Sequence, residues 1–181
     1  LTIELLLAQY TSLCESIESL DASIARIVEE NERYRTLCGA LCTFRGIDTL
    51  SAMTIVSELG DIRRFAHPRP LASYVGLDVA ERSSGGKEHK GGITKTGNRH
   101  IRTILTESCQ MASRRPILSK RIKQSRAGQP QDIVDVADRC MNRLHKKATR
   151  MLYAGKHKNK IKTACAREML GFIWEAMRLA A

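Results

Sequence analysis

Two adjacent serines, Ser83 and Ser84, stand directly before a pair of glycines in the middle of the chain. Glycine leaves a neighbouring hydroxyl accessible, and a serine oxygen presented in this way is suited to attack on a phosphodiester. Cations must lie nearby to offset the charge of the phosphorane-like transition state. The nearby cations are Arg82, Lys95, Arg99 and Arg102. This segment is therefore the leading candidate for phosphoryl chemistry on a nucleic acid.

A serine hydroxyl is a weak nucleophile at its ordinary pKa, so it also needs a base or a metal ion. Glu81 and Glu88 are the nearest carboxylates, but both are weak candidates because no carboxylate pair stands close in the sequence. If the serine is the nucleophile, its activating group is expected on another domain. The same spacing also fits a glycine-rich loop that binds phosphate without catalysis, and the residue types alone leave both interpretations open.

The serines belong to a segment, residues 78–97, that has no helical periodicity and is rich in glycine and lysine. Its glycines allow the backbone to approach a ligand closely, while Lys87, Lys90 and Lys95 supply positive charge. An irregular loop of this length inside a compact domain is uncommon and is usually functional or disordered. Within it, Ile93 and Thr94 are expected to form a short extended piece.

A helix is expected directly after this loop, capped by Asn98 and running to about Ser113. Its first turn carries Arg99, His100 and Arg102, although a helix N-terminus normally favours acidic side chains. Either an anion binds nearby or tertiary packing tolerates the charge. Apolar periodicity predicts further helices at 51–60, after His67, and at 116–126, 131–153 and 161–180. No β alternation appears elsewhere, so the fold class is all-α with one long loop.

The turn at Gly46 precedes the helix at 51–60 and has the outline of a helix–hairpin–helix. Such a hairpin presents backbone N–H groups to a phosphate. Asp48 replaces the second glycine of the usual turn, and its negative charge would repel DNA. A plain structural turn therefore fits these residues equally well.

Residues 1–37 carry a heptad repeat of apolar residues without glycine or proline. The a positions are Ile3, Tyr10, Ile17, Ile24 and Asn31, and the d positions are Leu6, Leu13, Leu20, Ile27 and Tyr34. Isoleucine at a with leucine at d favours a parallel two-stranded coiled coil, and a buried Asn31 would fix its register. A homodimer is expected; the alternative is an amphipathic helix that packs on its own domain.

Positive charge is concentrated in the second half of the chain. The 30 Lys+Arg against 19 Asp+Glu give a net charge of +11. Residues 1–37 sum to −4 and residues 38–80 to zero, whereas residues 81–127 sum to +9 and residues 128–181 to +6. A basic surface of this size suits a polyanion, with nucleic acid as the first choice. The basic linker at 156–160 is either a solvated loop or a further nucleic-acid contact.

The six cysteines form no C-x-x-C pair and mostly occupy apolar helical positions, so we expect reduced, intracellular thiols. A zinc site is not expected, because Cys38 and Cys42 lack a second ligand pair at a usable spacing. No membrane span or signal peptide is predicted. The chain opens on Leu1 rather than Met, so it is expected to be a piece of a longer protein.

Four motifs combine into a larger pattern: G-I-x-x-L-x-A-x-x-I-x-x-E-L-G-D at 46–61, R-F-x-H-x-R-x-L-A-S-Y-V-G-L at 64–77, S-S-G-G-K at 83–87 and G-G-I-T-K-T-G-N-R-H-I-R at 91–102. With them, the segment from about Leu41 to Pro116 resembles the C-terminal transposase domain of the IS110 (IS116/IS902-related) family of bacterial insertion sequences. That family is related to the Piv-type DNA invertases. The order and spacing of the motifs agree with the family.

The resemblance implies a transposase that acts on DNA. In the family, an N-terminal RuvC-like domain binds metal through a carboxylate tetrad, and a coiled coil links it to a C-terminal domain whose serine becomes transiently phosphoserine-linked to DNA. The family serine directly precedes glycine, which places it at Ser84, with Ser83 as the fallback. A structured bridge RNA selects target and donor in characterised members. The residues expected to position the phosphate are Arg82, Lys87, Lys90, Lys95, Asn98, Arg99 and Arg102.

Two departures from the family pattern matter. The acidic tetrad has no counterpart here, so the chain alone is expected to be inactive or only DNA-binding, with no cofactor of its own and with Mg²⁺ in the missing RuvC-like domain. Val79 stands where the family usually has proline, which loosens the loop but leaves the nucleophile in place.

These inferences divide the chain into three parts: a coiled-coil arm at 1–37, a transposase signature domain with the serine loop at 38–127, and C-terminal helices of the same domain at 128–181. The expected location is the bacterial cytoplasm, in association with the nucleoid. The alternative function is a non-catalytic dimeric module that binds DNA or RNA.

Overall fold

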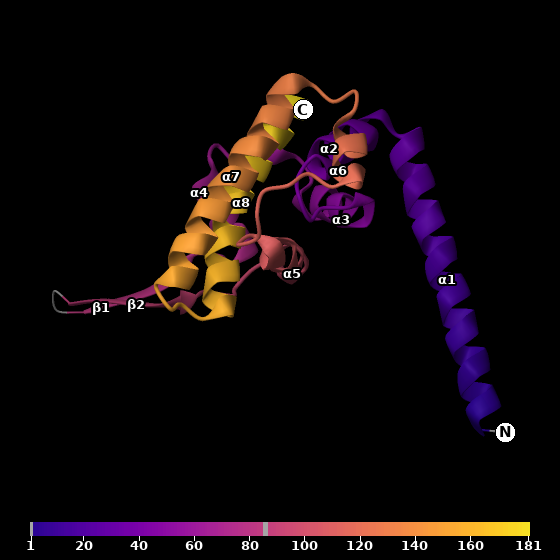
Figure 1. Ribbon diagram of the computed structural model, residues 1–181, viewed down its shortest axis with the longest axis horizontal. Helices are drawn as coiled ribbons and strands as arrows, with labels where there is room; N and C mark the ends of the chain where they lie inside the picture. Colours follow the sequence, from indigo (N-terminus) through magenta and orange to yellow (C-terminus); the bar gives the residue numbers. More distant parts are fainter. Residues whose placement is uncertain (1, 85–86) are drawn as a thin grey trace.

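The chain begins with a long helix that projects away from the rest of the molecule. The computed structural model describes residues 2–84 and 87–181, with residues 81–84 and 87–90 described as strand backbone. Helix α1 spans Thr2–Glu30, and its first two thirds lie clear of the other elements (Figure 1). Its apolar side chains are largely solvent-exposed: Ile3, Leu6, Tyr10, Leu13, Ile17 and Leu20. The amphipathic helix predicted for this region is therefore present, with its apolar face uncovered within this chain.

The prediction for Asn31 is wrong. The heptad pattern placed this residue at a buried position inside one continuous helix, but the helix breaks there, and α2 spans Glu32–Cys42. Asn31 is exposed and caps α2, with its side chain accepting a hydrogen bond from the Tyr34 N–H. The physical reason is that asparagine is one of the best N-cap residues, so it favours a new helix start over burial.

The body of the molecule is built around the last helix. Helices α3 (Thr49–Leu59), α4 (Pro68–Val75), α5 (Arg99–Ser108), α6 (Lys120–Arg126) and α7 (Gln131–Tyr153) precede α8, which spans Lys158–Ala180. Two short 3₁₀ turns, Ile62–Arg64 and Cys109–Met111, join α3 to α4 and extend α5. Helix α8 packs against α7, α5, α2 and α4. It is therefore the element on which the other layers are assembled.

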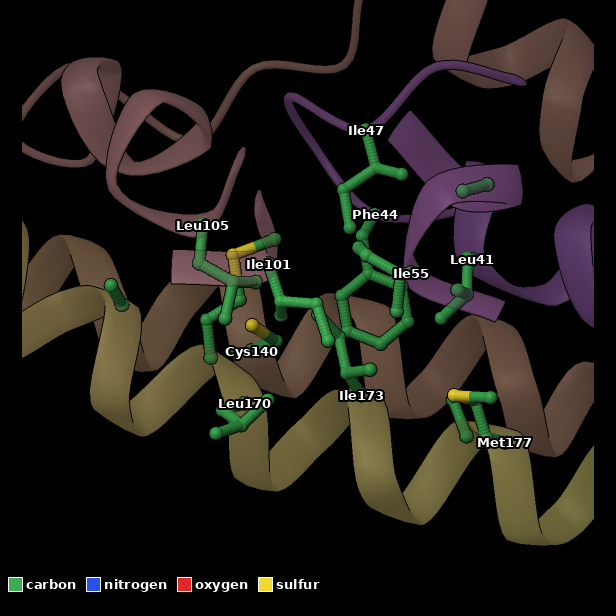
Figure 2. Packing of buried hydrophobic residues seen from close by; sticks show 14 of the residues in the cluster. Leu41, Phe44, Ile47, Ile55, Ile101, Leu105, Cys140, Leu170, Ile173 and Met177 are labelled. Carbon is green, nitrogen blue, oxygen red and sulfur yellow. The ribbon is translucent and has the colours of Figure 1, made fainter. Parts of the chain in front are cut away.

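One hydrophobic core joins the early helices to α8. Figure 2 shows Leu41, Phe44 and Ile55 lying over Ile173 and Met177 of α8. These side chains are at most 1% exposed. Truncation of a buried leucine or isoleucine to alanine typically costs about 2–5 kcal/mol, so a residue such as Leu41 contributes a large share of the total stability.

The all-α class is confirmed, and the long irregular loop predicted inside it is wrong. Strands β1 (Val79–Ser84) and β2 (Lys87–Ile93) pair as an antiparallel hairpin, which projects from the body (Figure 1). The expected extended piece at Ile93 is the end of β2. The sequence did not predict the hairpin because its strands lack alternating apolar residues. Backbone hydrogen bonds hold the two strands together, and such bonds do not depend on a particular residue pattern.

Most of the predicted helices are present with small shifts in their ends. The prediction at 131–153 coincides with α7. Asn98 caps α5 as expected, although the α-helix ends at Ser108 and continues as a 3₁₀ turn. Helix α6 begins at Lys120 rather than 116, because Ser119 supplies the N-cap through a hydrogen bond from the Ile122 N–H. Helix α8 begins earlier than predicted, since His157 caps it.

The turn between α2 and α3 is closed by its own carboxylate. Asp48 caps α3 and accepts a hydrogen bond of 2.8 Å from the Ser51 N–H. Burial raises the pKa of Asp48, but the Ser51 hydrogen bonds and the nearby Arg121 lower the pKa by more than burial raises it. The net pKa is below the ordinary value, so the carboxylate stays charged. An anion bound at this helix start would have to displace that carboxylate. The plain structural turn is the interpretation that the geometry favours.

All six cysteines are free thiols, and Cys38, Cys109, Cys140 and Cys165 are buried. Burial raises the pKa of Cys38 and of Cys165, each to about 11. Within residues 2–84 and 87–181, no helix has the length and apolar character that crossing a bilayer requires.

Candidate functional site at the β-hairpin

The hairpin places the predicted serine beside a basic residue. Ser84 is the last residue of β1 and is paired with Lys87, while Ser83 is paired with Glu88 and Arg82 with His89. The side chains of Arg82, Ser83, Ser84, Lys87 and Lys90, and of the carboxylates Glu81 and Glu88, lie outside the described residues. The backbone register therefore brings Ser83, Ser84 and Lys87 to the far ends of two projecting strands, away from the apolar core (Figure 1).

A backbone clamp holds the base of this ribbon. The Thr94 N–H donates to the Asp78 carbonyl at 2.8 Å, and the Lys95 N–H donates to the Gly76 carbonyl at 3.1 Å. One step further, the Asn98 N–H donates to the Tyr74 carbonyl at 2.9 Å. Main-chain hydrogen bonds thus join the end of α4 to the segment that leads into α5, and they fix the point at which the hairpin leaves the body.

Two glycines make this clamp possible. A Cβ atom at Gly97 would lie 2.2 Å from the Tyr74 carbonyl oxygen, and one at Gly76 would lie 2.5 Å from the Thr96 carbonyl oxygen. Both have positive φ, +131° and +72° respectively, a region that other residues rarely adopt. The sequence interpretation gave Gly97 a role in approaching a ligand, and that role is wrong: its missing side chain lets two segments of this chain approach each other.

A carboxylate at the base of β1 ties the hairpin to two helices. Asp78 accepts from Arg167 of α8, with 3.0 Å between Nη2 and Oδ1, and from the Ser73 hydroxyl of α4. The Asp78 side chain is 23% exposed, so water only partly screens the ion pair. Asp78 therefore fixes the start of β1 through its side chain as well as through its carbonyl.

Asn98 is committed to internal hydrogen bonds. Its side-chain oxygen accepts from the Ile101 N–H at 3.0 Å, and its amide nitrogen donates to Glu58 Oε2 at 2.6 Å. The Glu58 carbonyl in turn accepts from the Tyr74 hydroxyl at 3.1 Å. Asn98 was predicted to contact phosphate, and the geometry assigns both of its polar atoms to the packing of α5 against α3.

Arg102 lies under the hairpin base rather than on the open surface. Its Nη1 donates to the Val75 carbonyl at 2.8 Å, where the C-terminus of α4 leaves a carbonyl without a helical partner. A Cβ atom at Gly76 would lie 2.8 Å from the same nitrogen. Arg102 is half-buried, so it brings positive charge beneath the clamp while its guanidinium bonds the backbone.

Three predicted or neighbouring basic residues remain accessible. Lys95, Arg99 and His100 are exposed, and they follow one another along the outer side of the clamp into the first turn of α5. Lys95 has a φ of +58°, a left-handed conformation that lysine adopts at a cost of about 1–2 kcal/mol. Its N–H bond to Gly76 holds it there. Lys95 and Arg99 therefore place exposed positive charge next to the hairpin base, where a phosphate backbone can reach it.

No three His, Cys, Asp or Glu side chains among the described residues are grouped so that they could hold a metal ion. The magnesium that the resemblance implies is expected in a RuvC-like domain outside this chain, and the described side chains are assigned no step that passes through a metal.

Four residues of this site were missed by sequence reasoning: Asp78, Arg167, Glu58 and Tyr74. Glu58 appeared only as a letter of the first motif and Tyr74 only as a letter of the second. A charged residue at the junction between a helix and a glycine-rich segment is the signal that could have found Asp78. Its partner Arg167 lies 89 residues away on α8, and no local pattern reveals such a contact.

Residues 38–124 match the family model described as "Transposase IS116/IS110/IS902 family". The chain is 34% identical to a putative transposase, y4qE, of Sinorhizobium fredii, over 90% of this chain and 42% of that protein. It is 31% identical to the transposase for insertion sequence element IS1533 of Leptospira borgpetersenii, over 74% of this chain and 38% of that protein. The transposase for insertion sequence element IS1111A of Coxiella burnetii is 31% identical over 64% of this chain and 31% of its own length.

The chain spans less than half the length of these relatives. The matched segment contains the clamp, the hairpin and α5, which are the parts that the four motifs encode. The resemblance drawn from those motifs is confirmed: the domain at residues 38–124 belongs to the IS116/IS110/IS902 family of transposases.

Proposed function

We propose that the chain is the DNA-joining part of a transposase, in which Ser84 attacks a DNA phosphodiester. The observation that carries the proposal is the position of Ser84 at the end of a projecting ribbon, paired with Lys87 and held by a rigid base. Such a ribbon can reach a duplex without unfolding any part of the core.

The proposed step forms a bond between Ser84 Oγ and phosphorus while the bond between phosphorus and the 3′ oxygen breaks. The serine proton passes to a base outside the described side chains, and the leaving 3′ oxygen takes up a proton to become a hydroxyl. The product is a 5′-phosphoserine link. Positive charge along the ribbon and at Lys95 and Arg99 stabilises the extra charge on the phosphoryl oxygens.

The remaining parts of the proposal follow from family membership. The metal-binding carboxylates and Mg²⁺ would belong to a RuvC-like domain outside this chain, and a structured guide RNA would select the DNA. The protein would act on the bacterial chromosome, in the nucleoid. These parts of the proposal assign no role to individual residues of the described chain; they require only its basic surface.

The test is covalent capture of DNA by the longest reading frame that contains this chain, using plasmid DNA that carries the ends of the element. After denaturation, the wild-type protein should retain labelled DNA, and Ser84→Ala should retain none. Ser83→Ala and Ser113→Ala serve as matched controls and should keep the adduct. An adduct on the Ser84→Ala protein, mapped by mass spectrometry to another residue, removes Ser84 from the proposed role.

A second candidate function is a dimeric module that binds DNA or RNA without chemistry, and α1 supports its dimeric character. The a and d positions of α1 are 58–73% exposed from Ile3 to Leu20, a contiguous apolar stripe that no other element of the described residues covers along that length. A second copy of the helix would bury the stripe in a coiled coil. The dimer is compatible with either function.

Sedimentation velocity tests the dimer. The pair Leu13→Lys and Leu20→Lys changes two d positions and should convert a dimer to a monomer. The pair Ser12→Lys and Ser19→Lys adds the same charge at c positions and should leave the dimer intact. A wild-type chain that sediments as a monomer at high concentration contradicts the coiled-coil proposal. The covalent-capture test distinguishes the two functions: a wild-type protein that binds DNA but forms no covalent adduct is a binding module rather than a transposase.

A further inference from the structure

The turn between α7 and α8 is a surface that the serine chemistry does not use. Helix α7 ends at Tyr153 and α8 begins at Lys158, so the chain reverses within four residues. Gly155, with a φ of +66°, allows the reversal, and the Lys156 N–H donates back to the Met151 carbonyl at 3.0 Å. The turn is therefore a fixed feature at the end of the helical pair.

This end of the molecule is uniformly basic. Residues 146–167 contain eight lysines and arginines and no aspartate or glutamate. Two of the eight have acidic partners, since Lys147 pairs with Glu168 and Arg167 with Asp78. The side chains of Lys146, Arg150, Lys156, Lys158 and Lys160 are exposed. A cluster of this kind attracts a polyanion and repels its own copies.

Tyr153 stands in the middle of this charge with 87% of its surface exposed. It follows Lys146 by seven residues and Arg150 by three, so the three residues share one face of α7. The ring contributes almost nothing to the core, and no aromatic or cation–π contact is found for it in the described part of the chain. Its flat faces are open to a ligand.

The Arg167–Asp78 ion pair connects this surface to the hairpin. Lys160 lies seven residues before Arg167 on α8, which places both on the same face of the helix, about 10 Å apart along its axis. The ribbon base therefore joins α8 in the half of the helix that begins at the α7–α8 turn.

We propose that the α7–α8 turn binds an unpaired nucleic-acid strand, with one base stacked on Tyr153 and phosphates held by Lys156, Lys158 and Lys160. An open aromatic ring among lysines matches a single strand because an unpaired base exposes its face, whereas bases in a duplex are already stacked on each other. The inference does not rest on Ser84 or on any covalent step, and it adds a second contact beyond the ribbon.

Fluorescence anisotropy of the whole chain tests the proposal, with a labelled single-stranded DNA of about 20 nucleotides, the same sequence as RNA, and the matching DNA duplex. Tyr153→Ala should weaken single-strand binding about tenfold, the effect of one lost base stack, while Tyr153→Phe should bind like the wild type. Tighter binding of RNA assigns the strand as RNA; equal or tighter binding of DNA assigns it as DNA.

The lysines are tested against a charge-matched control. Lys158→Gln with Lys160→Gln should lower the slope of log affinity against log salt by about 1.4, because two single-strand phosphate contacts are lost. Lys120→Gln with Lys123→Gln removes the same charge from exposed positions on α6, at the opposite end of α7, and should leave the slope nearer the wild-type value. Equal slopes for the two pairs, or an equal loss on duplex and single strand for Tyr153→Ala, overturn the proposal.

Discussion

Arg167 and Asp78 lie 89 residues apart in the sequence and 3.0 Å apart in the structure, where one guanidinium nitrogen meets one carboxylate oxygen. The contact joins the last helix to the first residue before the hairpin. Because Asp78 also binds the Ser73 hydroxyl and the Thr94 N–H, this residue is held by α4, by α8 and by the residue that directly follows β2. The orientation of the ribbon is therefore set by the helical body.

Arg167→Ala should loosen the hairpin with little loss of global stability. The ion pair is partly exposed, so its removal should cost about 1 kcal/mol or less. Hydrogen exchange of the amides in residues 79–93 should accelerate, while those of α7 keep their protection. Arg139→Ala removes a different arginine–carboxylate contact, with Glu175 between α7 and α8, and serves as the control. Unchanged exchange at 79–93 would show that the main-chain clamp alone holds the ribbon.

Gly97→Ala should destabilise the domain by more than about 2 kcal/mol. The new methyl group would meet the Tyr74 carbonyl at 2.2 Å, and the φ of +131° is strained for alanine. Gly92→Ala is the matched control, because a Cβ there meets nothing within 4 Å. Thermal or urea unfolding of both variants checks the contrast. Equal midpoints for the two would contradict the close approach of the two segments.

Asn98→Ala should lower the free energy of unfolding by about 1–2 kcal/mol, since it removes the cap of α5. Asn98→Asp keeps an oxygen for the Ile101 N–H but places a second carboxylate against Glu58, whose Oε2 lies 2.6 Å from the present amide nitrogen. The aspartate variant should therefore recover stability when Glu58 is also changed to Gln. A double-mutant cycle measured by urea unfolding checks this coupling.

The pH dependence of stability should carry a contribution from Glu168. Burial raises its pKa, but the hydrogen bonds from Arg143 and Lys147 lower the pKa by more than burial raises it. The net pKa is below the ordinary value of 4.5. Because the pKa of Glu168 is lower in the folded state, the group stabilises the fold at pH values above its pKa in the unfolded chain. This stability is lost as the pH falls through its pKa in the folded protein.

Glu168→Gln should therefore cost about 1–2 kcal/mol near neutral pH and should flatten the decline in stability below about pH 5. Glu175→Gln breaks the more exposed pair with Arg139 and should change the profile less. Urea midpoints measured across the acid range check both variants. A Glu168→Gln profile parallel to that of the wild type would contradict the assignment.

The elements that repeat regularly in the sequence were predictable, and those held by single contacts were not. Helix α7 could be placed to the residue because apolar positions recur along its whole length. The Asn31 break was missed because a heptad pattern does not register that one asparagine prefers to cap a helix. The hairpin was missed because main-chain pairing, rather than apolar side chains, defines it.

The candidate site divides in the same way. The motifs located the serine segment, the clamp glycines and the cap of α5, because these depend on neighbours in the sequence. The sequence did not distinguish Arg102 and Asn98, which bond internally, from Arg99, which is exposed. That distinction depends on where Val75 and Glu58 lie after folding, and both belong to other elements.

The central place of α8 in the core has a consequence for synthesis of the protein. Helices α2, α4, α5 and α7 all lean on a segment that the ribosome makes after them. Until residues 158–180 emerge, the apolar faces of those helices stay uncovered and prone to aggregation. A premature stop codon anywhere upstream of α8 would therefore yield a chain open to proteolysis rather than a shortened working domain.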